Sequence, residues 1–309
     1  MIVKSLLAAI ILFSVNAHAA TIAQRLGYAS DAKLVIVHAD DIGMSHSVNQ
    51  ATFAAMATGS VNSGSMMVPC SWFAEAAAYY RAQPDLDLGL HLTLTSEWQD
   101  YKWRALSGES AAYSLHDAAG FMFPDVGPVA ASARPEDVAR ELRAQVDAAL
   151  AQGIRPTHLD SHMGTLFATP QFFQAYVQTG RRYRLPILVP REALQAQAPQ
   201  LASLVDPHEL LVDRIIMADP SVAAGEWQAY YTAVIENLQP GVTEIIVHAG
   251  YDNHELQAIA RNHPDYGAAW RQRDTDFFAD PKSRALLAAH DAIQVTWREL
   301  GQLVYPTDE

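Results

Sequence analysis

The sequence predicts an α/β protein built as a single closed or nearly closed (β/α) barrel of about seven or eight parallel strands. Short apolar, β-branched runs alternate along the chain with segments of helical periodicity, the pattern of parallel strands joined by helices. About seven or eight such units in roughly 290 residues suit one barrel better than two domains. No internal repeat or low-complexity linker divides the chain. We therefore expect one domain covering residues 21–309.

The first predicted units are short. Residues 34–37 (LVIV) form a wholly apolar run, typical of a strand that is covered on both faces. Ser45 is a candidate N-cap for a helix that ends near residue 57. The same patterns predict a strand at 63–68, a helix at 73–82 and a strand at 86–92.

Residues 95–134 interrupt this regularity. They are rich in Ser, Gly, Trp and Pro and show no sustained periodicity. A loop of that length inside a compact domain is usually functional or an added lid. We therefore expect an insertion in the barrel at this point.

Regular units return at residue 135. Pro135 suits the first turn of a helix that stops at Gly153. Further strands are expected at 157–160, 186–189, 210–217, 243–248 and 292–296, and further helices at 170–184, 222–237 and 282–289.

The first 20 residues have the three parts of a cleavable export signal. Lys4 supplies the positive charge, residues 5–15 form an apolar stretch too short to span a bilayer, and residues 17–19 (AHA) form a cleavage site. A buried N-terminal helix is the alternative interpretation. The mature chain would begin near Ala20 or Thr21 and be periplasmic or secreted. Because no later segment approaches about 18 consecutive apolar residues, we expect a soluble protein without a stable membrane anchor.

Composition narrows both the partners and the chemistry. The chain has 34 Asp+Glu against 21 Lys+Arg, a formal net charge of −13, which argues against a nucleic-acid partner because such partners need a basic surface. Cys70 is the single cysteine, so an internal disulfide and a Cys-x-x-Cys metal site are both excluded. Any metal site must therefore use Asp, Glu and the 12 histidines. The sequence leaves the oligomeric state open.

Residues of the metal-binding and acid–base types stand at the ends of four predicted strands. The C-terminal ends of parallel barrel strands converge on one mouth, where active sites lie. One such histidine is ordinarily a hydrogen-bonded core residue, but four strand ends with the same character favour a metal or acid–base site. The residues are His38, Asp40 and Asp41 after the first strand, His91 after another, His158, Asp160 and His162 around a third, and His248 after a fourth.

Asp40 and Asp41 are expected to have different tasks. Adjacent residues of an extended strand point to opposite sides, so one would bind a metal while the other holds a water or the backbone. A plain strand-to-helix turn with Gly43 at positive φ is the alternative. Asp160 and the neighbouring His158 are given supporting positions, with Asp160 orienting a metal ligand or accepting a buried hydrogen bond.

At these positions the sequence resembles the carbohydrate deacetylases of the YdjC/ChbG type, a polysaccharide deacetylase-like family. The four matching motifs stand in the family's order and together cover most of the chain. Residues 38–43 (HADDIG) resemble its Asn-Ala-Asp-Asp-Phe-Gly motif, residues 89–93 (GLHLT) its Gly-Leu-His-Leu stretch, residues 157–162 (THLDSH) its His-x-Asp-Ser-His motif, and residues 248–251 (HAGY) its His-Pro-Gly-Tyr.

The resemblance implies a distorted (β/α) barrel and a divalent metal held by Asp41, His91 and His162. By the same analogy Asp40 is the general base and His248 the general acid. Zn²⁺ is the first candidate for the ion, with Mg²⁺ or another first-row ion as alternatives. The implied reaction is removal of N-acetyl groups from amino-sugar-containing oligosaccharides or glycans by a metal-activated water.

Three departures from the family pattern leave this metal set intact. His38 stands where the family has Asn, Gly164 replaces the second His of its Ser-His-x-His, and Ala249 replaces Pro. The sugar, its linkage and length, and the choice between N- and O-acetyl groups therefore stay open.

Two other functions remain as alternatives, an exported glycoside hydrolase and a non-catalytic sugar-binding protein on the same barrel. Adjacent Asp40 and Asp41 are a poor glycosidase pair, because its two carboxyl groups must flank the scissile bond. A binding protein would tolerate loss of the site, whereas here every ligand and acid–base position is filled.

Aromatic side chains of the insertion are candidates for contacts to the substrate, because aromatic rings suit the apolar faces of sugars. Ordinary core packing at the barrel mouth is the equal alternative. The candidates are Trp98 and Trp103, with Tyr101, Phe121 and Phe123 nearby, and Trp72 and Tyr251 from other segments.

Overall fold

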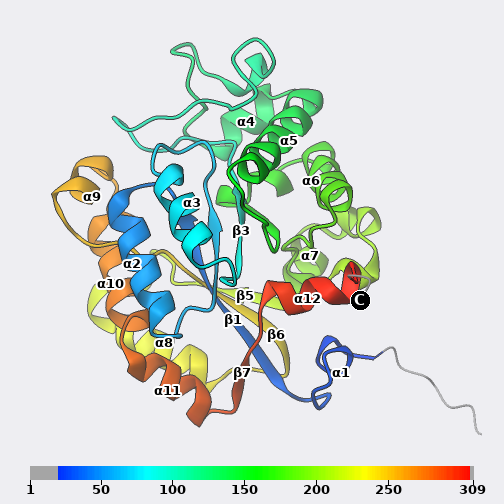
Figure 1. Ribbon diagram of the computed structural model, residues 1–309, viewed down its shortest axis with the longest axis vertical. Helices are drawn as coiled ribbons and strands as arrows, with labels where there is room; N and C mark the ends of the chain where they lie inside the picture. The colour runs from blue at the N-terminus through cyan, green and yellow to red at the C-terminus, as the bar shows by residue number, and fades with distance from the viewer. Residues whose placement is uncertain (1–19, 307–309) are drawn as a thin grey trace, which may run out of the picture.

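The computed structural model describes residues 20–306 and shows a curled parallel sheet surrounded by helices (Figure 1). The strand order is β4-β3-β2-β1-β6-β5, and β7 pairs with β1 as well. Every strand pair is parallel, so the predicted α/β class is confirmed. The expected export signal lies outside the described residues except for Ala20, and it stays a prediction. Within residues 20–306, no helix has the length and apolar character needed to cross a membrane.

The long strand β1 is the centre of the sheet. It pairs with β6 from Lys33 to Ala39, with β7 over its first residues and with β2 from His38 onward. Its apolar run is buried on both faces, as predicted, but the strand continues through the Asp-Asp pair to Ile42. The strands are β1 (Lys33–Ile42), β2 (Ser63–Met66), β3 (Leu88–Leu92), β4 (Leu159–Ser161), β5 (Arg214–Ile216), β6 (Gly241–Val247) and β7 (Ala292–Gln294).

Irregular backbone completes the ring between β4 and β5. Ile187 forms a parallel bridge to Leu159, and Pro190 forms one to Val212. The predicted strand at 186–189 is wrong as a regular element, because the prolines at both ends of this segment lack the N–H that a ladder needs. The segment nevertheless takes the place of a strand, which makes the barrel distorted.

The predicted helices form the outer layer at nearly the expected bounds, except that the helix expected from residue 222 begins at Trp227. Ser45 caps α2 by accepting the Val48 N–H at 3.2 Å, and Gly153 follows α5 at φ +80°. The expected helices are α2 (His46–Ala57), α3 (Phe73–Ala82), α5 (Pro135–Ala151), α6 (Pro170–Tyr183), α8 (Trp227–Glu236) and α11 (Pro281–Ala289).

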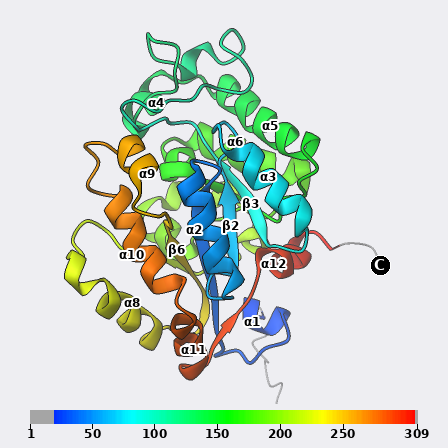
Figure 2. The same cartoon turned by 60° about the vertical axis from the view of Figure 1, so that its left-hand side comes forward.

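Other helices were not expected from the sequence. In α10, charged and aromatic residues are buried together, so a stripe of apolar residues does not mark its buried face. Figure 2 shows α10 between α2 and α8 on one side of the barrel, where it contacts both. These helices are α1 (Ile22–Arg25), α4 (Val126–Ser132), α7 (Arg191–Gln197), α9 (His254–Ile259), α10 (Ala268–Phe278) and α12 (Trp297–Val304).

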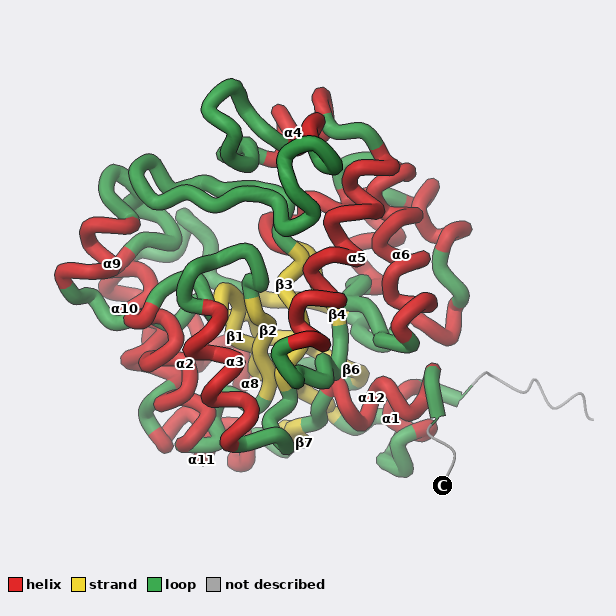
Figure 3. The backbone as a smooth tube through the Cα atoms, turned by 45° about the horizontal axis from the view of Figure 1, so that its top comes forward, coloured by secondary structure: helices red, strands yellow, loops and turns green. Residues whose placement is uncertain are grey.

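The expected insertion at 95–134 extends beyond one end of the barrel as loops with the short helix α4 (Figure 3). Buried carboxylates of α5 hold it in place. Glu141 accepts the Ser107 N–H at 2.9 Å and its hydroxyl at 2.7 Å, and Asp137 accepts the Ser114 hydroxyl at 2.7 Å. The insertion is therefore anchored to the outer helix layer by specific hydrogen bonds.

Candidate metal and acid–base site

The carboxylates of Asp40 and Asp41 face the same imidazole, so the expectation that they point to opposite sides is wrong. The register between β1 and β2 shifts between Ala39 and Ile42, and Asp41 has φ +67°. This bulge and the left-handed backbone at Asp41 break the strict alternation of an extended strand. Asp41 Oδ1 lies 3.4 Å and Asp40 Oδ2 3.8 Å from His91 Nε2.

Asp41, His91 and His162 come together from β1, β3 and the end of β4. Their ligand atoms lie within 4.8 Å of one another and all three residues are buried. Asp41 Oδ1 is 3.8 Å from His162 Nε2 and has no hydrogen-bond partner. A buried carboxylate oxygen without a partner, facing two imidazole nitrogens, fits a divalent cation of the zinc type.

The outer nitrogens of both imidazoles are occupied, which leaves Nε2 for the site. His91 Nδ1 lies 2.7 Å from Asp160 Oδ1, and His162 Nδ1 lies 2.9 Å from the hydroxyl of Thr95. Such contacts fix the tautomer and orientation of a metal-binding histidine. Asp160 has the orienting position that the sequence predicts, whereas His158 is fully buried and stacks on Trp297 at 4.8 Å.

Arg271 of α10 holds the second oxygen of Asp41 and had no signal in the sequence. Its Nη2 lies 2.6 Å from Asp41 Oδ2, and its Nε donates to the Tyr266 carbonyl at 2.7 Å. Burial works against ionisation of Asp41, but the Arg271 guanidinium and the nearby imidazoles outweigh it and hold the pKa of Asp41 well below its usual range. The structure therefore keeps Asp41 ionised and fixes which oxygen faces the two histidines.

His248 follows β6, and α10 fixes its backbone too. Asp274 Oδ2 accepts the His248 N–H at 2.8 Å, and the Thr275 hydroxyl accepts the Gly250 N–H at 2.9 Å. The imidazole Nε2 lies 3.8 Å from Asp40 Oδ2. Burial lowers the pKa of His248 to about 4, so its imidazole is neutral near pH 7.

His91 differs from His248, because its pKa is raised and not lowered. Burial works against protonation, but the Asp160 and Asp40 carboxylates outweigh it and raise the pKa of His91 to about 10. Without a metal, His91 therefore carries a proton near pH 7, and it must release that proton to bind a cation.

A layer of buried polar groups lies below the site around His38. Its Nε2 is 3.2 Å from Asp40 Oδ1 and 3.1 Å from Asp160 Oδ2, and its Nδ1 is 3.9 Å from Glu244 Oε1. Burial works against protonation of His38, but these carboxylates hold its pKa well above the usual value. Burial raises the pKa of Glu244 to about 8 despite the nearby imidazole. A charged residue between the apolar residues of β6 was the available signal for Glu244.

A cavity of about 810 Å³ opens above the site, within the range of small-molecule pockets. Asp40, Asp41, His91, His162 and His248 all line it. One wall of the cavity, on the side of β5, β6 and α7, is apolar and includes Leu188, Leu194, Ile215 and Ile246. The other wall is formed by the insertion and the segment before α10 and carries aromatic and acidic side chains. These are Glu97, Trp98, Asp125, His263, Asp265 and Tyr266.

Of the predicted substrate contacts, Trp98 lines this cavity, whereas Trp103 and Tyr251 do not. Trp103 is buried and donates its indole N–H to the Thr95 carbonyl at 2.7 Å, which makes it part of the packing under the insertion. Tyr251 is exposed outside the cavity. The further candidates Tyr101, Phe121, Phe123 and Trp72 also lie outside the cavity lining.

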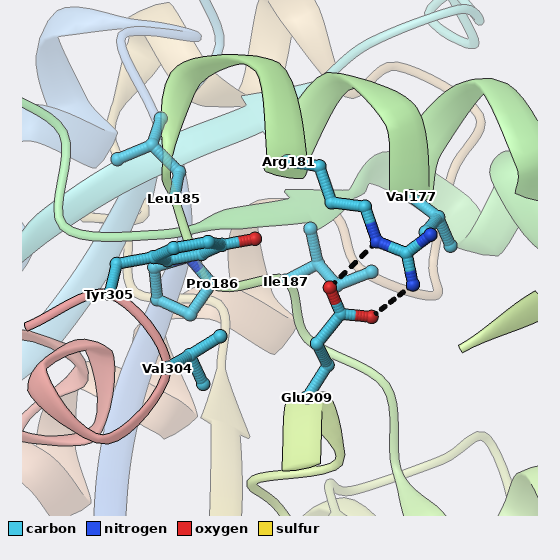
Figure 4. A pocket seen from close by; sticks show the side chains of 9 residues that line it. Val177, Arg181, Leu185, Pro186, Ile187, Glu209, Val304 and Tyr305 are labelled. Carbon is cyan, nitrogen blue, oxygen red and sulfur yellow. Dashed lines mark hydrogen bonds and ion pairs between the residues drawn. The ribbon is translucent and has the colours of Figure 1, made fainter. Parts of the chain in front are cut away.

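A second pocket, between α6 and the C-terminal segment, is too small to hold a substrate. Figure 4 shows the Arg181–Glu209 ion pair beside Tyr305 in this pocket, with nitrogen–oxygen distances of 2.8 and 2.7 Å. Its volume of about 10 Å³ corresponds to about one water molecule. The large cavity is therefore the candidate functional site.

The protein is thus a distorted parallel (β/α) barrel that gathers two aspartates and three histidines at its mouth. The chain is a member of the YdjC-like protein family, which matches residues 34–289. The resemblance noted in the motifs is thereby confirmed.

Two relatives match most of the length of this chain. A carbohydrate deacetylase of Thermus thermophilus is 32% identical over 291 residues, covering 91% of this chain and 98% of the relative. A carbohydrate deacetylase of Geobacillus stearothermophilus is 28% identical over 272 residues, covering 87% and 98%. The crystal structure of a candidate cellobiose-phosphate cleavage protein from Enterococcus faecalis V583 superposes with a TM-score of 0.71 at 21% identity, covering 87% of this chain and 99% of that one. This last similarity concerns the fold.

Proposed function

We propose that the protein is a metal-dependent carbohydrate deacetylase that removes N-acetyl groups from amino-sugar-containing glycans. The observation that carries the proposal is the unpartnered Asp41 Oδ1, buried and facing the Nε2 atoms of His91 and His162 in a large cavity. The two deacetylase relatives, each covered over 98% of its length, support the same activity. A glycosidase would need carboxyl groups on both sides of a bond, whereas Asp40 and Asp41 face the same imidazole.

Asp41 Oδ1, His91 Nε2 and His162 Nε2 would hold the ion. Two imidazoles and one carboxylate suit Zn²⁺ better than Mg²⁺, which prefers oxygen ligands. When bound, a divalent ion polarises the acetamide carbonyl and makes a coordinated water more acidic. Arg271 and Asp160 would keep the carboxylate and the His91 imidazole in place for that ion.

Asp40 and His248 would move the protons. The Asp40 carboxylate takes a proton from the water that attacks the acetyl carbon. His248 is neutral in the resting site, so it is ready to accept that proton from Asp40, 3.8 Å away, and to deliver it to the sugar nitrogen as the carbon–nitrogen bond breaks. The products are acetate and the free amine, and no covalent intermediate with the protein is needed.

An acetate-release assay on N-acetylated sugar oligomers, with the protein freed of metal and then reloaded with zinc, tests this function. Asp41→Ala should abolish both zinc binding and acetate release. Asp40→Asn should keep the zinc but lower kcat by about 10²-fold or more. Asp85→Asn changes an exposed carboxylate outside the cavity lining and serves as the control. Full activity without metal, or a fully active Asp40→Asn variant, would contradict the mechanism.

We also propose that the protein is exported to the periplasm or secreted. The positive, apolar and small-residue parts of residues 1–20 support this location. Mass spectrometry of the N-terminus from the native host tests it. A mature chain that begins near Ala20 or Thr21 is expected, and an unprocessed Met1 would contradict export.

A further inference from the structure

We infer that the cavity selects amino-sugar glycans that carry free, positively charged amino groups beside the acetamido group, and that it disfavours sugars bearing phosphate, sulfate or carboxylate. This inference rests on the proposed deacetylase function and specifies its substrate class. It follows from the distribution of charge around the cavity and from the groups there that lack a partner.

Negative groups far outnumber positive ones in the cavity wall. Arg271 is the single Arg or Lys side chain in the lining formed by the described residues, and its guanidinium already binds Asp41 at 2.6 Å. A bound divalent ion would offset two charges at the bottom of the cavity and leave the outer carboxylates uncompensated. The acidic residues in the lining are Asp40, Asp41, Glu97, Asp125, Asp160 and Asp265.

Among the described residues, five of these six carboxylates, all except Asp41, have no Lys or Arg side chain beside them, and Asp125 and Asp265 have no histidine partner either. Asp125 and Asp265 are exposed, and within residues 20–306 their carboxylates form no hydrogen bond or ion pair. Glu97 Oε1 lies 3.5 Å from His162 Nε2, while its Oε2 is buried without a partner. The buried carboxylate of Asp137, in contrast, is paired with both Arg134 and Arg140. Asp125 and Asp265 therefore offer unpaired carboxylates at the cavity to a ligand that brings its own positive charge.

Tyr266 indicates that this ligand includes a sugar ring rather than a small amine alone. Its side chain is partly exposed and lines the cavity, and its ring face suits the apolar face of a sugar ring. Trp98 is almost fully buried in the same wall, with the Arg271 guanidinium 5.8 Å from the centre of its ring, so it shapes the cavity as packing.

Electrostatics then separates substrates of similar shape. A cleft lined by one sign of charge and walled by low-dielectric protein concentrates the potential inside it. An ammonium group on the sugar next to the acetamide is attracted to the outer carboxylates, whereas a phosphate group is repelled. Because these carboxylates are at the mouth, the preference should weaken as salt screens them.

The test compares three disaccharides with the same ring skeleton. They are neutral N,N′-diacetylchitobiose, chitobiose with one acetyl group and one free amine, and diacetylchitobiose 6-phosphate. With the zinc-loaded protein at low ionic strength, kcat/KM for acetate release should be at least about tenfold higher for the cationic than for the anionic substrate. The ratio should fall severalfold in about 0.5 M NaCl. Equal values for all three substrates would overturn the inference and leave the deacetylase function standing.

Calorimetry tests the preference for ligand charge by binding alone, without acetate release. Fully deacetylated chitobiose and its 6-phosphate are titrated into the protein with and without zinc, and the doubly cationic sugar should bind at least about tenfold more tightly in both states. If no substrate releases acetate but this preference holds, the proposed function fails and the inference on ligand charge stands. If the phosphate binds equally well, the inference fails.

Variants test whether the carboxylates of the cavity cause the preference for a cationic sugar. Asp125→Asn combined with Asp265→Asn should lower the cation-to-anion ratios of both kcat/KM and affinity severalfold. Asp85→Asn combined with Glu236→Gln changes the net charge by the same two units at exposed positions outside the cavity lining, and it should leave the ratios unchanged. A control pair that lowers the ratios as much as the cavity pair would show that net charge, and not the cavity, sets the preference.

Discussion

Arg271→Met removes the buried guanidinium that compensates Asp41. The two groups meet at 2.6 Å and both are almost fully buried. Unit charges about 4 Å apart interact by about 4 kcal/mol at an effective dielectric constant of about 20. Removing one partner of such a pair costs about 3–5 kcal/mol, because the other charge is left buried and unpaired. We therefore expect the free energy of unfolding of the metal-free protein to fall by about 3–5 kcal/mol.

Zinc should reduce this loss, since a divalent cation beside Asp41 Oδ1 replaces part of the missing charge. Urea denaturation of wild type and variant, in chelator and in zinc, measures both values. Arg273→Met is the matched control on the same helix, because that guanidinium lies over the Trp227 ring at 4.5 Å and should contribute about 0.5–2 kcal/mol. A loss below about 1 kcal/mol for Arg271→Met, or the same loss with and without zinc, would refute the reasoning.

The pH dependence of this loss has a definite sign. A carboxyl group whose pKa is lowered by folding stabilises the protein above its unfolded pKa of about 4, and that contribution is lost as the pH falls toward the folded value. Arg271 lowers the pKa of Asp41 in the folded protein. The difference in unfolding free energy between wild type and Arg271→Met should therefore be full at pH 7 and shrink below about pH 4.

Three further predictions concern other titrating and orienting groups. Because the pKa of His91 is raised to about 10, zinc binding at pH 7 should release about one proton from it, measured by calorimetry in buffers of different ionisation enthalpy; release of none would contradict its protonation. Asp160→Asn should weaken zinc binding by about 10–100-fold in a chelator competition, and an unchanged affinity would exclude an orienting role. Burial raises the pKa of Glu244 to about 8, so this group should make the wild type less stable as the pH rises from about 4 to 8. Glu244→Gln should reduce that loss of stability, and the exposed Glu236→Gln should leave it unchanged.

Local signals in the chain were sufficient for most of the scaffold. The apolar run of β1, the Ser45 cap of α2 and the Pro135 start of α5 each depend on neighbouring residues, so they could be read without the fold. The segment at 186–189 failed as a strand because its prolines act on a ladder that local periodicity does not describe. Helix α10 was missed because its buried face mixes charged and aromatic residues, and the charged ones are explained only by the groups that they contact in the folded protein.

The candidate site was also predicted only in part. The motifs placed Asp41, His91 and His162 at strand ends, and the parallel topology made their convergence predictable. The prediction that the two aspartates point to opposite sides was wrong. The bulge in the pairing of β1 with β2 and the positive φ at Asp41 could not be read from the alternation of side chains along a strand. Trp103 was assigned to the substrate because sequence does not distinguish a buried aromatic ring from one that lines a cavity.

The sequence by itself determined the α/β class, the order of the barrel units and the identity of the Asp and His residues at its mouth, because strand periodicity, helix caps and motifs are local properties. The tertiary structure alone decided which atoms face one another. Arg271 reaches Asp41 across 230 positions of sequence, and Asp160 reaches His91 across 69. Charge compensation and pKa shifts depend on distance and burial, and these exist only once the barrel has closed around the site.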